Sequence, residues 1–306
     1  MFNDTTYPGL ESMPNGRARS WIVPGCLALE GGAFRGMYTE GVLDALMEAD
    51  VNLHTTIGVS AGALSGMNYV SGQIGRAARM NLLYRHDSRY VGLTAMKNNH
   101  GVIGFDFMFG DDTPGIEPFD EERFLRPDRR FVAVASNLTT GKPEFFESGK
   151  SEHIVLACQA SASMPYVSEP VMIDEVPYLD GGCTVKIPYQ WALDRPFRKV
   201  VVVRTRPRDY RKSVTPRKSH AAAHTVYRNY PEFADALEKS SENYNNQCEE
   251  LLQLEQDGRI FVIAPSRPVE ISRLEGDMEK LGALYDMGYM DARNVMRELK
   301  EYLELV

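Results

Sequence analysis

Continuous apolar runs of strand length, separated by helical patterns, constrain the fold of this chain most. Cys26 to Leu29, Phe131 to Ala135 (FVAVA) and Val200 to Val203 (VVVV) show no alternation with polar residues. Such runs are expected of strands covered on both faces of a parallel sheet. Helical spacing of apolar residues follows in Gly36 to Asp50, and a small-residue segment, Ser60 to Ser71, predicts a second helix. Strand and helix therefore alternate, which predicts an α/β fold with a mostly parallel central sheet.

The C-terminal part of the chain has a different, mainly helical pattern. Apolar residues recur at helical spacing from Glu232 to Asp257, and Gly258 follows as a natural C-cap. Arg259 to Ala264 (RIFVIA) predicts one more strand, and a helix from Ser272 is expected to break near Gly288 before another begins. The sequence thus predicts a helical elaboration after the sheet.

Composition excludes several classes of protein. Among 306 residues, 34 Lys and Arg face 42 Asp and Glu, a net charge of −8, which disfavours a nucleic-acid partner. The four cysteines are far apart and form no CxxC pair, so neither a zinc site nor a disulfide framework is indicated. No apolar run approaches the roughly 20 residues that span a bilayer, and no signal peptide is recognisable. A reducing cytoplasm is the expected location.

Leu27 to Gly36, LALEGGAFRG, predicts a strand that runs into a glycine-rich turn. Backbone N–H groups in such a turn bind something negative, either a phosphate or a transient oxyanion. A nucleotide-binding P-loop requires Lys-Ser/Thr after its last glycine, but Met37 and Tyr38 follow Gly36, and the dinucleotide pattern requires glycine where Ala33 stands. The chain thus lacks both patterns, which argues against a nucleotide-binding site at this turn.

Gly58-Val-Ser60-Ala-Gly62 is a GxSxG pattern between a predicted strand, Thr56 to Val59, and a predicted helix. This is the setting of a nucleophile elbow, in which a sharp strand-to-helix turn exposes a serine oxygen. A serine hydroxyl needs a neighbouring base, because it is a poor nucleophile while protonated. Ser60 is therefore a candidate nucleophile.

Two kinds of base are available to Ser60. His220 and His224 could complete a triad in the usual order, but they lie in a polar segment after the last core strand and are better explained as surface or helix residues. Asp180 ends a short apolar run and is followed by Gly181 and Gly182, which let the chain turn away; the same DGG is also an ordinary turn. The residues alone therefore do not decide whether a histidine or Asp180 is the base for Ser60.

Taken together, EGGAFRG, GVSAG and DGG resemble the patatin-like phospholipase family, over a region from about Cys26 to Pro188. The segment ACQASASMP is also similar to bacterial members. The resemblance implies a three-layer α/β/α hydrolase in which Ser60 is the nucleophile and Asp180 its general base, without a histidine. It also implies an oxyanion loop made of Gly31, Gly32, Ala33, Phe34, Arg35 and Gly36.

The resemblance further implies a serine acyl hydrolase of the phospholipase A or lipid esterase type, which needs neither a metal ion nor an organic cofactor. A non-catalytic lipid-binding or scaffold protein with the same fold is the alternative. Ala33 stands where the family usually has a third glycine, so the backbone there is expected to avoid torsion angles reserved for glycine. Arg35 either anchors the loop, the favoured interpretation, or meets a substrate phosphate.

Two segments bear on the substrate and on membrane contact. One glycine-containing segment is expected either to line an acyl channel or lid or to form ordinary core; its large apolar residues are Met96, Phe105, Phe107, Met108 and Phe109. The basic segment Arg204 to Lys218 suits a solvated loop or peripheral contact with anionic lipid.

The expected division is an N-terminal extension at 1–24, a catalytic domain at 25–215 and a mainly helical region at 216–306 packed on it. The sequence does not indicate an oligomeric state.

Overall fold

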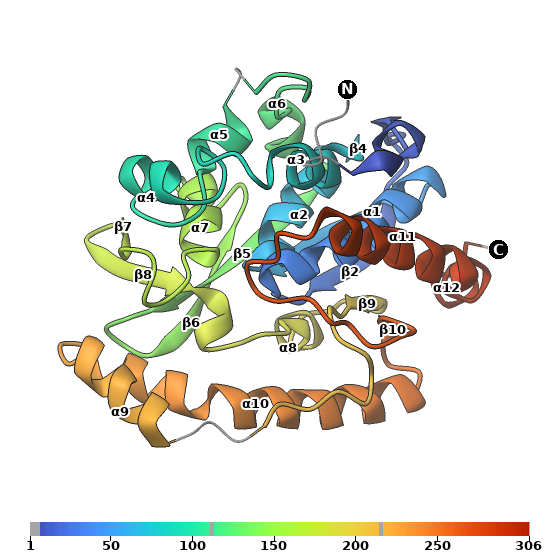
Figure 1. Ribbon diagram of the computed structural model, residues 1–306. Coiled ribbons are helices and arrows are strands. Elements are labelled where there is room, and N and C mark those ends of the chain that lie inside the picture. Colours follow the sequence, from blue (N-terminus) through green and yellow to red (C-terminus); the bar gives the residue numbers. More distant parts are fainter. Residues whose placement is uncertain (1–6, 111–112, 214–216, 306) are drawn as a thin grey trace.

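The computed structural model describes residues 7–110, 113–213 and 217–305, and a mixed sheet lies at the centre of this part (Figure 1). Its strand order is β10-β9-β2-β3-β5-β8-β7, and β6 pairs with β5. The parallel strands are β10 (Phe261–Ile263), β9 (Val200–Val203), β2 (Val23–Leu29), β3 (Leu53–Val59) and β5 (Arg130–Asn137). The antiparallel strands are β6 (Lys142–Glu147), β7 (Val171–Ile173) and β8 (Val176–Asp180). The predicted α/β class and mostly parallel sheet are confirmed.

The register of the parallel strands brings their carboxyl ends to one edge of the sheet. Leu29 at the end of β2 lies opposite Gly58 in β3 and Val203 in β9. The segments that leave these strands therefore emerge side by side, as is usual for ligand sites in open α/β sheets. The glycine-rich turn after β2 and the GxSxG turn after β3 both lie there.

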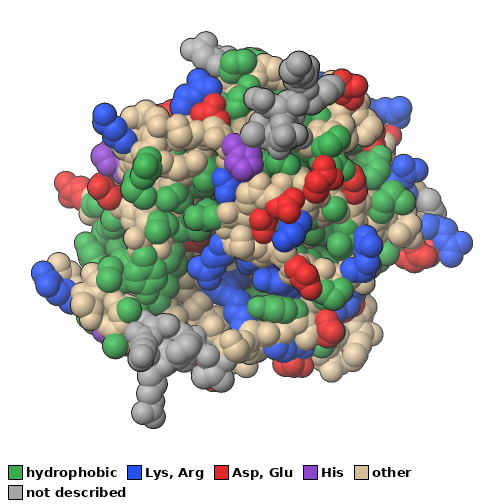
Figure 2. Space-filling view, in the orientation of Figure 1, with side chains coloured by type: hydrophobic (Ala, Val, Ile, Leu, Met, Phe, Trp, Pro, Cys, Tyr) green, Lys and Arg blue, Asp and Glu red, His purple; other side chains and the backbone are tan. Residues whose placement is uncertain are grey.

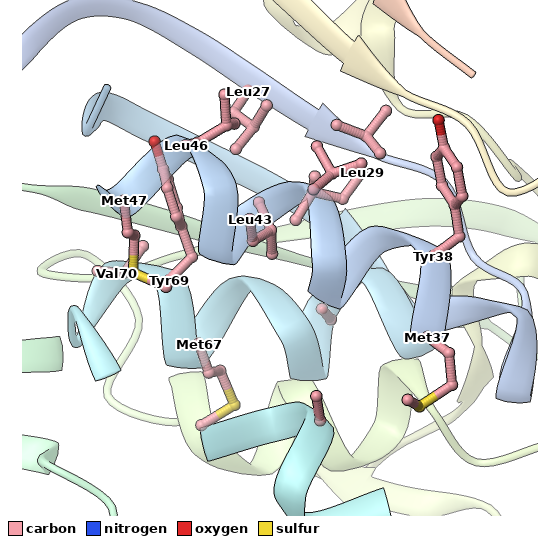
Figure 3. Close-up of a cluster of buried hydrophobic side chains, with 14 of the residues drawn as sticks. Leu27, Leu29, Met37, Tyr38, Leu43, Leu46, Met47, Met67, Tyr69 and Val70 are labelled. Atoms are coloured by element: carbon pink, nitrogen blue, oxygen red, sulfur yellow. The ribbon is translucent and has the colours of Figure 1, made fainter. Parts of the chain in front are cut away.

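Alternate residues of β2 face two different hydrophobic cores. Leu27 and Leu29 pack under α1 (Gly36–Glu48) and α2 (Ala61–Val70), as Figure 3 shows. Cys26 and Ala28 face the opposite side, where α8 (Tyr189–Leu193) and α10 (Pro231–Gln256) cover the sheet. Burial of both faces explains why the strands read as continuous apolar runs, and it gives the predicted three layers of helices, sheet and helices.

The remaining elements connect these layers or extend them. In chain order they are η1 (Pro8–Ser12), β1 (Gly16–Arg17), η2 (Ala33–Arg35), β4 (Gln73–Ile74), α3 (Arg76–Tyr84), α4 (Leu93–Asn99), α5 (Phe105–Phe109), α6 (Glu121–Phe124), α7 (Ile154–Ser161), η3 (Gly181–Cys183), α9 (Arg217–Val226), α11 (Met278–Asn294) and α12 (Met296–Tyr302). β1 pairs with β4 in a small separate sheet. No helix in the described part of the chain has the length and apolar character needed to cross a bilayer.

The C-terminal helices differ from the prediction at one point. α10 ends at Gln256 with Asp257 as its C-cap, and Gly258 follows in left-handed backbone with φ 67°, so the predicted glycine at this helix end is one residue beyond the C-cap. The expected break near Gly288 is wrong, because α11 continues through it to Asn294. A Cβ atom at Gly288 would lie 2.0 Å from the carbonyl oxygen of Tyr38. The glycine therefore serves close packing of α11 on α1 rather than a break, and α12 follows after Val295.

The boundaries 24/25 and 215/216 stay predictions. Residues 215 and 216 lie outside the described part of the chain. β2 begins at Val23, within the segment predicted as an extension, and the C-terminal strand β10 joins the central sheet beside β9.

Candidate active site

Ser60 lies in the sharp turn between β3 and α2. Its backbone has φ 55° and ψ −125°, a strained conformation that costs about 1–3 kcal/mol. A Cβ atom at Gly58 would lie 2.4 Å from the carbonyl oxygen of Gly62, and one at Gly62 would lie 2.7 Å from that of Leu29. Glycine at both positions lets strand, turn and helix approach this closely, which is the geometry of a nucleophile elbow.

The backbone N–H of Ser60 donates a hydrogen bond to Ser161 Oγ at 2.9 Å. Ser161 is fully buried and is the last residue of α7. No sequence pattern marks this serine as chemically important, since it lies in a segment notable only for its similarity to bacterial relatives. Its hydroxyl group accepts the backbone N–H of the strained turn and so helps to hold the turn in place.

Asp180 is the last residue of β8, which runs antiparallel to β5. This arrangement brings its carboxylate to Ser60 across 120 residues of sequence: Ser60 Oγ donates a hydrogen bond to Asp180 Oδ2 at 2.8 Å. Gly182 N–H donates to Asp180 Oδ1 at 2.7 Å. Ser60 is 6% and Asp180 9% exposed, so the pair is largely shielded from bulk water.

Burial raises the pKa of Asp180 above its usual value, although the hydrogen bonds from Ser60 and Gly182 and the charge of Lys186 act in the opposite direction. A carboxylate with a raised pKa is a better proton acceptor. The glycine after it is fixed by packing, because a Cβ atom at Gly181 would lie 2.1 Å from the carbonyl oxygen of Val134. The DGG turn therefore aims the carboxylate while its backbone lies against β5.

The glycine-rich turn after β2 lies directly against the elbow. A Cβ atom at Gly31 would be 3.2 Å from Ser60 Cβ, and one at Gly36 would be 3.0 Å from Ala61 Cβ. Phe34 N–H donates to the carbonyl oxygen of Arg273 at 3.4 Å. The N–H groups of Gly32 and of Ala33 have no acceptor among the described residues. These two donors are available to an oxyanion formed at Ser60.

Ala33 departs from the sequence-based expectation. Its φ of 49° lies in the left-handed region that favours glycine, so the substitution of alanine for the usual glycine has not moved the backbone elsewhere. Alanine tolerates this region at a cost of about 1–2 kcal/mol. The loop keeps its shape, and Ala33 keeps its N–H group.

Arg35 lines the cavity beside the loop. Its Nε is buried without a hydrogen-bond partner in the described structure, and burial is the main cause that lowers its pKa. Among the described residues, no side-chain hydrogen bond of Arg35 supports the loop-anchoring role favoured by the sequence.

Two cavities meet at Ser60 and Ala33. The larger, about 590 Å³, is also lined by Asp180. The smaller, about 60 Å³, is mostly apolar, with Phe34, Met37, Leu64, Ile103 and Met108 in its wall. Of the aromatic and methionine residues considered for an acyl channel, Met108 lines this cavity, whereas Phe107 and Phe109 pack edge-on against Tyr84 and Phe119.

Comparison with known proteins identifies the family. The model of a family described as patatin-like phospholipase matches residues 27–193, more than half of the chain. The chain belongs to the patatin-like phospholipase family. A second model, described as a domain of unknown function (DUF6363), matches residues 230–304, which include α10, α11 and α12.

Two curated relatives of this patatin-like protein are similar over part of their length. An uncharacterized protein of Escherichia coli, YjjU, is 27% identical over 190 residues, covering 60% of this chain and 53% of its own. The probable lipid hydrolase 463L of Invertebrate iridescent virus 6 is 26% identical over 183 residues, covering 55% and 62%. The chain thus spans about half to three fifths of the length of these relatives.

Two solved structures are also similar to this chain. VipD from Legionella pneumophila is matched at a TM-score of 0.49 and 12% identity, over 94% of this chain and 70% of VipD. ExoU from Pseudomonas aeruginosa, in complex with SpcU, is matched at a TM-score of 0.32 and 14% identity, over 90% of this chain and 70% of the other.

The larger cavity brings together basic side chains whose proximity the sequence did not predict. Arg206 and Lys212 belong to the basic segment considered for membrane contact, whereas Lys186 and Arg273 carried no signal. Figure 2 shows Lys and Arg side chains gathered in a hollow on one face of the molecule. Their arrangement depends on packing between distant segments, which no local pattern reveals.

The histidines are not placed beside Ser60 by any described contact. His224 Nε2 lies 3.4 Å from Glu238 Oε2 and 3.5 Å from Asp235 Oδ1, on α10. The side chain of His220 lies outside the described part of the chain. His224, Asp235 and Glu238 could together hold a metal ion, since their ligand atoms lie within 4.8 Å of one another, but such surface groups are common without one.

Proposed function

We propose that this patatin-like protein is a serine acyl hydrolase that cleaves acyl esters of lipids, with Ser60 as nucleophile and Asp180 as general base. The observation that carries the proposal is the 2.8 Å hydrogen bond between Ser60 Oγ and Asp180 Oδ2 at a strained strand-to-helix turn. Family membership supports the choice of reaction.

The reaction proceeds in two acyl transfers. Asp180 accepts the proton of Ser60 Oγ, and the oxygen attacks the ester carbonyl to form a tetrahedral intermediate. The intermediate collapses as Asp180 returns the proton to the leaving alcohol, which leaves an acyl group on Ser60. Water then attacks this ester with Asp180 as base, and the carboxylic acid is released.

The N–H groups of Gly32 and Ala33 stabilise the oxyanion of both tetrahedral intermediates. One such donor contributes about 3 kcal/mol in other hydrolases. The N-terminus of α2 begins at Ala61, directly after Ser60, and its partial positive charge acts in the same direction.

The two cavities suggest how a lipid ester is oriented. With the carbonyl carbon at Ser60, the apolar cavity around Met37 and Met108 receives the acyl chain. The larger, polar cavity then receives the alcohol part of the ester. The name of the viral relative, probable lipid hydrolase, supports a lipid as the substrate.

We also propose a cytoplasmic protein that contacts membranes peripherally. Tyr166 lines the larger cavity and is 53% exposed, and Val167 and Met172 expose apolar surface near it in sequence. Figure 2 shows hydrophobic side chains gathered beside the hollow. All four cysteines are free and buried, which fits a reducing compartment.

Turnover of p-nitrophenyl butanoate tests the proposed function. We expect the wild-type protein to hydrolyse it and Ser60→Ala and Asp180→Asn each to lose about 10³-fold or more in kcat. His224→Ala serves as the control and is expected to retain turnover. Retained activity in Ser60→Ala contradicts the proposal, and loss in His224→Ala indicates a triad instead. A wild-type protein that binds lipid vesicles without turnover supports the scaffold alternative.

A further inference from the structure

The larger cavity has a positive charge although the chain as a whole is negative. Its lining contains three acidic residues, Glu30, Asp180 and Glu238, and five basic ones, Arg35, Lys186, Arg206, Lys212 and Arg273. The full sequence has a net charge of −8. A concave site of one sign concentrates ligands of the opposite sign.

The five basic side chains are not neutralised by carboxylates. None of them forms an ion pair with another residue in the described parts of the chain. Lys186 Nζ donates to Ser240 Oγ at 2.6 Å, and Arg206 Nη1 donates to the carbonyl oxygen of Val269 at 2.6 Å. Arg35 Nε is buried without a partner. The lining therefore has more basic than acidic residues, and its basic side chains form no direct ion pair among the described residues.

The surroundings of Lys212 show the same excess of positive over negative charge in this cavity. Its pKa is lowered to about 6, mainly by burial and then by the charge of Lys186; Glu30 acts in the opposite direction, and Arg273 and Arg35 add smaller lowering effects. Its ammonium lies 4.6 Å from the ring centroid of Tyr244. An anion placed among these groups relieves their mutual repulsion.

Both cavities share Ser60, so a bound ester has a defined direction. An ester whose acyl chain occupies the apolar cavity must direct its alcohol part into the basic one. We propose that the basic cavity is a subsite for the phosphate of a lipid headgroup, and that a terminal phosphomonoester is preferred to a zwitterionic phosphodiester. The proposal rests on the proposed hydrolysis at Ser60.

A phosphomonoester fits this site for reasons of charge and geometry. It has a charge of about −1.5 to −2 at pH 7 and three acceptor oxygens, and guanidinium groups such as those of Arg35, Arg206 and Arg273 bind such oxygens in pairs. A headgroup that ends in an ammonium ion would instead bring a further cation into a cavity whose lining has more basic than acidic residues.

Three of the basic residues come from outside the part of the chain that matches the patatin-like model. Arg206 and Lys212 follow β9, and Arg273 lies in the segment between β10 and α11. This segment is anchored over the oxyanion loop, because Phe34 N–H donates to the carbonyl oxygen of Arg273. The neighbouring Leu274 lines the apolar cavity. The C-terminal part of this chain thus shapes both sides of the site.

Steady-state kinetics with soluble short-chain esters test the proposal. The substrates are dibutanoyl glycerol 3-phosphate and dibutanoyl glycerophosphocholine, with p-nitrophenyl butanoate as the uncharged reference. We expect kcat/KM of the wild type for the phosphomonoester to exceed that for the phosphocholine ester by at least about tenfold. Arg273→Gln and Lys212→Gln are each expected to reduce this ratio about tenfold, mainly through KM.

Arg297→Gln is the matched control, because it removes one charge from the 80% exposed side chain on α12 and is expected to leave the ratio unchanged. A wild-type ratio near one, with p-nitrophenyl butanoate hydrolysed normally, overturns the headgroup subsite and leaves the hydrolase intact. So does an unchanged ratio in both cavity variants.

Calorimetry on Ser60→Ala separates failure of the subsite from failure of the proposed function. If no ester is hydrolysed, the proposed hydrolysis fails, and with it the headgroup role. Glycerol 3-phosphate is expected to bind Ser60→Ala more tightly than inorganic phosphate, and Arg273→Gln in that background to weaken binding about tenfold. Equal or tighter binding of inorganic phosphate assigns the cavity to a free anion and overturns the headgroup proposal.

Discussion

Ser161→Ala tests whether the strained turn at Ser60 depends on the hydrogen bond from its backbone N–H. The donor and Ser161 Oγ are 2.9 Å apart and buried. Replacement by alanine leaves a buried N–H without an acceptor, which costs about 1–3 kcal/mol. At about 3 °C per kcal/mol for a protein of this size, the melting temperature falls by about 3–9 °C. Relaxation of the turn also moves Ser60 Oγ from Asp180, so we expect kcat to fall about tenfold.

Thermal unfolding by circular dichroism and turnover of p-nitrophenyl butanoate measure the two effects. Ser163→Ala is a matched control: it removes the 2.8 Å bond from Ser163 Oγ to the carbonyl oxygen of Gln159, which still accepts the N–H of Ala162. We expect it to cost less than about 1 kcal/mol and to leave kcat within about twofold. A Ser161→Ala protein indistinguishable from Ser163→Ala in both measurements refutes the reasoning.

Three further predictions concern sterics and protons. Gly62→Ala places a Cβ atom 2.7 Å from a β2 carbonyl oxygen and is expected to lower the free energy of unfolding by about 1–3 kcal/mol and to lower kcat. The control, Gly276→Ala, is expected to change neither quantity, because its Cβ atom would meet no atom closer than 3.5 Å. Equal melting temperatures of the two variants contradict this. The pKa of Asp180 is raised by burial, so the folded state holds this proton more tightly than the unfolded state and loses stability as pH rises from 3.8 through the folded pKa. We therefore expect kcat/KM to rise with pH through an acid limb above 3.8 and Asp180→Asn to melt no lower than wild type at pH 8; an acid limb at or below 3.8 contradicts this. Because the pKa of Lys212 is lowered to about 6, binding of glycerol 3-phosphate at pH 8 is expected to be accompanied by uptake of a proton. Calorimetry in Tris and HEPES detects this uptake as a binding enthalpy that depends on the buffer, and Lys212→Met is expected to abolish the dependence. A buffer-independent enthalpy in the wild type contradicts this.

The parallel strands were predictable because their signals are local, whereas the choice of Asp180 as the base came from the resemblance of three motifs to a family. β5 and β9 are buried on both faces, and residues 131–135 of β5 and all of β9 are therefore apolar. Ser60 and Asp180 each end a short apolar run and are followed by glycines that permit a turn. Three motifs in order then sufficed to indicate a family.

The features that the sequence missed depend on contacts between distant segments. Glycine is a residue that often breaks helices, but Gly288 lies inside α11 because the backbone of α1 packs too closely there for a side chain. The torsion angle of Ala33 is fixed by the turn between β2 and η2 rather than by its own preference. Arg273 joins the cavity only because the segment after β10 crosses the glycine-rich turn after β2, where Phe34 N–H donates to its carbonyl oxygen.

Labelling with a fluorophosphonate probe, followed by mass spectrometry of the intact protein and its peptides, tests the central claim most directly. An activated serine is phosphonylated, whereas ordinary serines are not, because only a neighbouring base makes the hydroxyl nucleophilic. We predict one adduct on the wild-type protein, located on Ser60, with no adduct on Ser60→Ala and a strongly reduced rate for Asp180→Asn. An unlabelled wild-type protein, or labelling that Asp180→Asn leaves undiminished, contradicts the account.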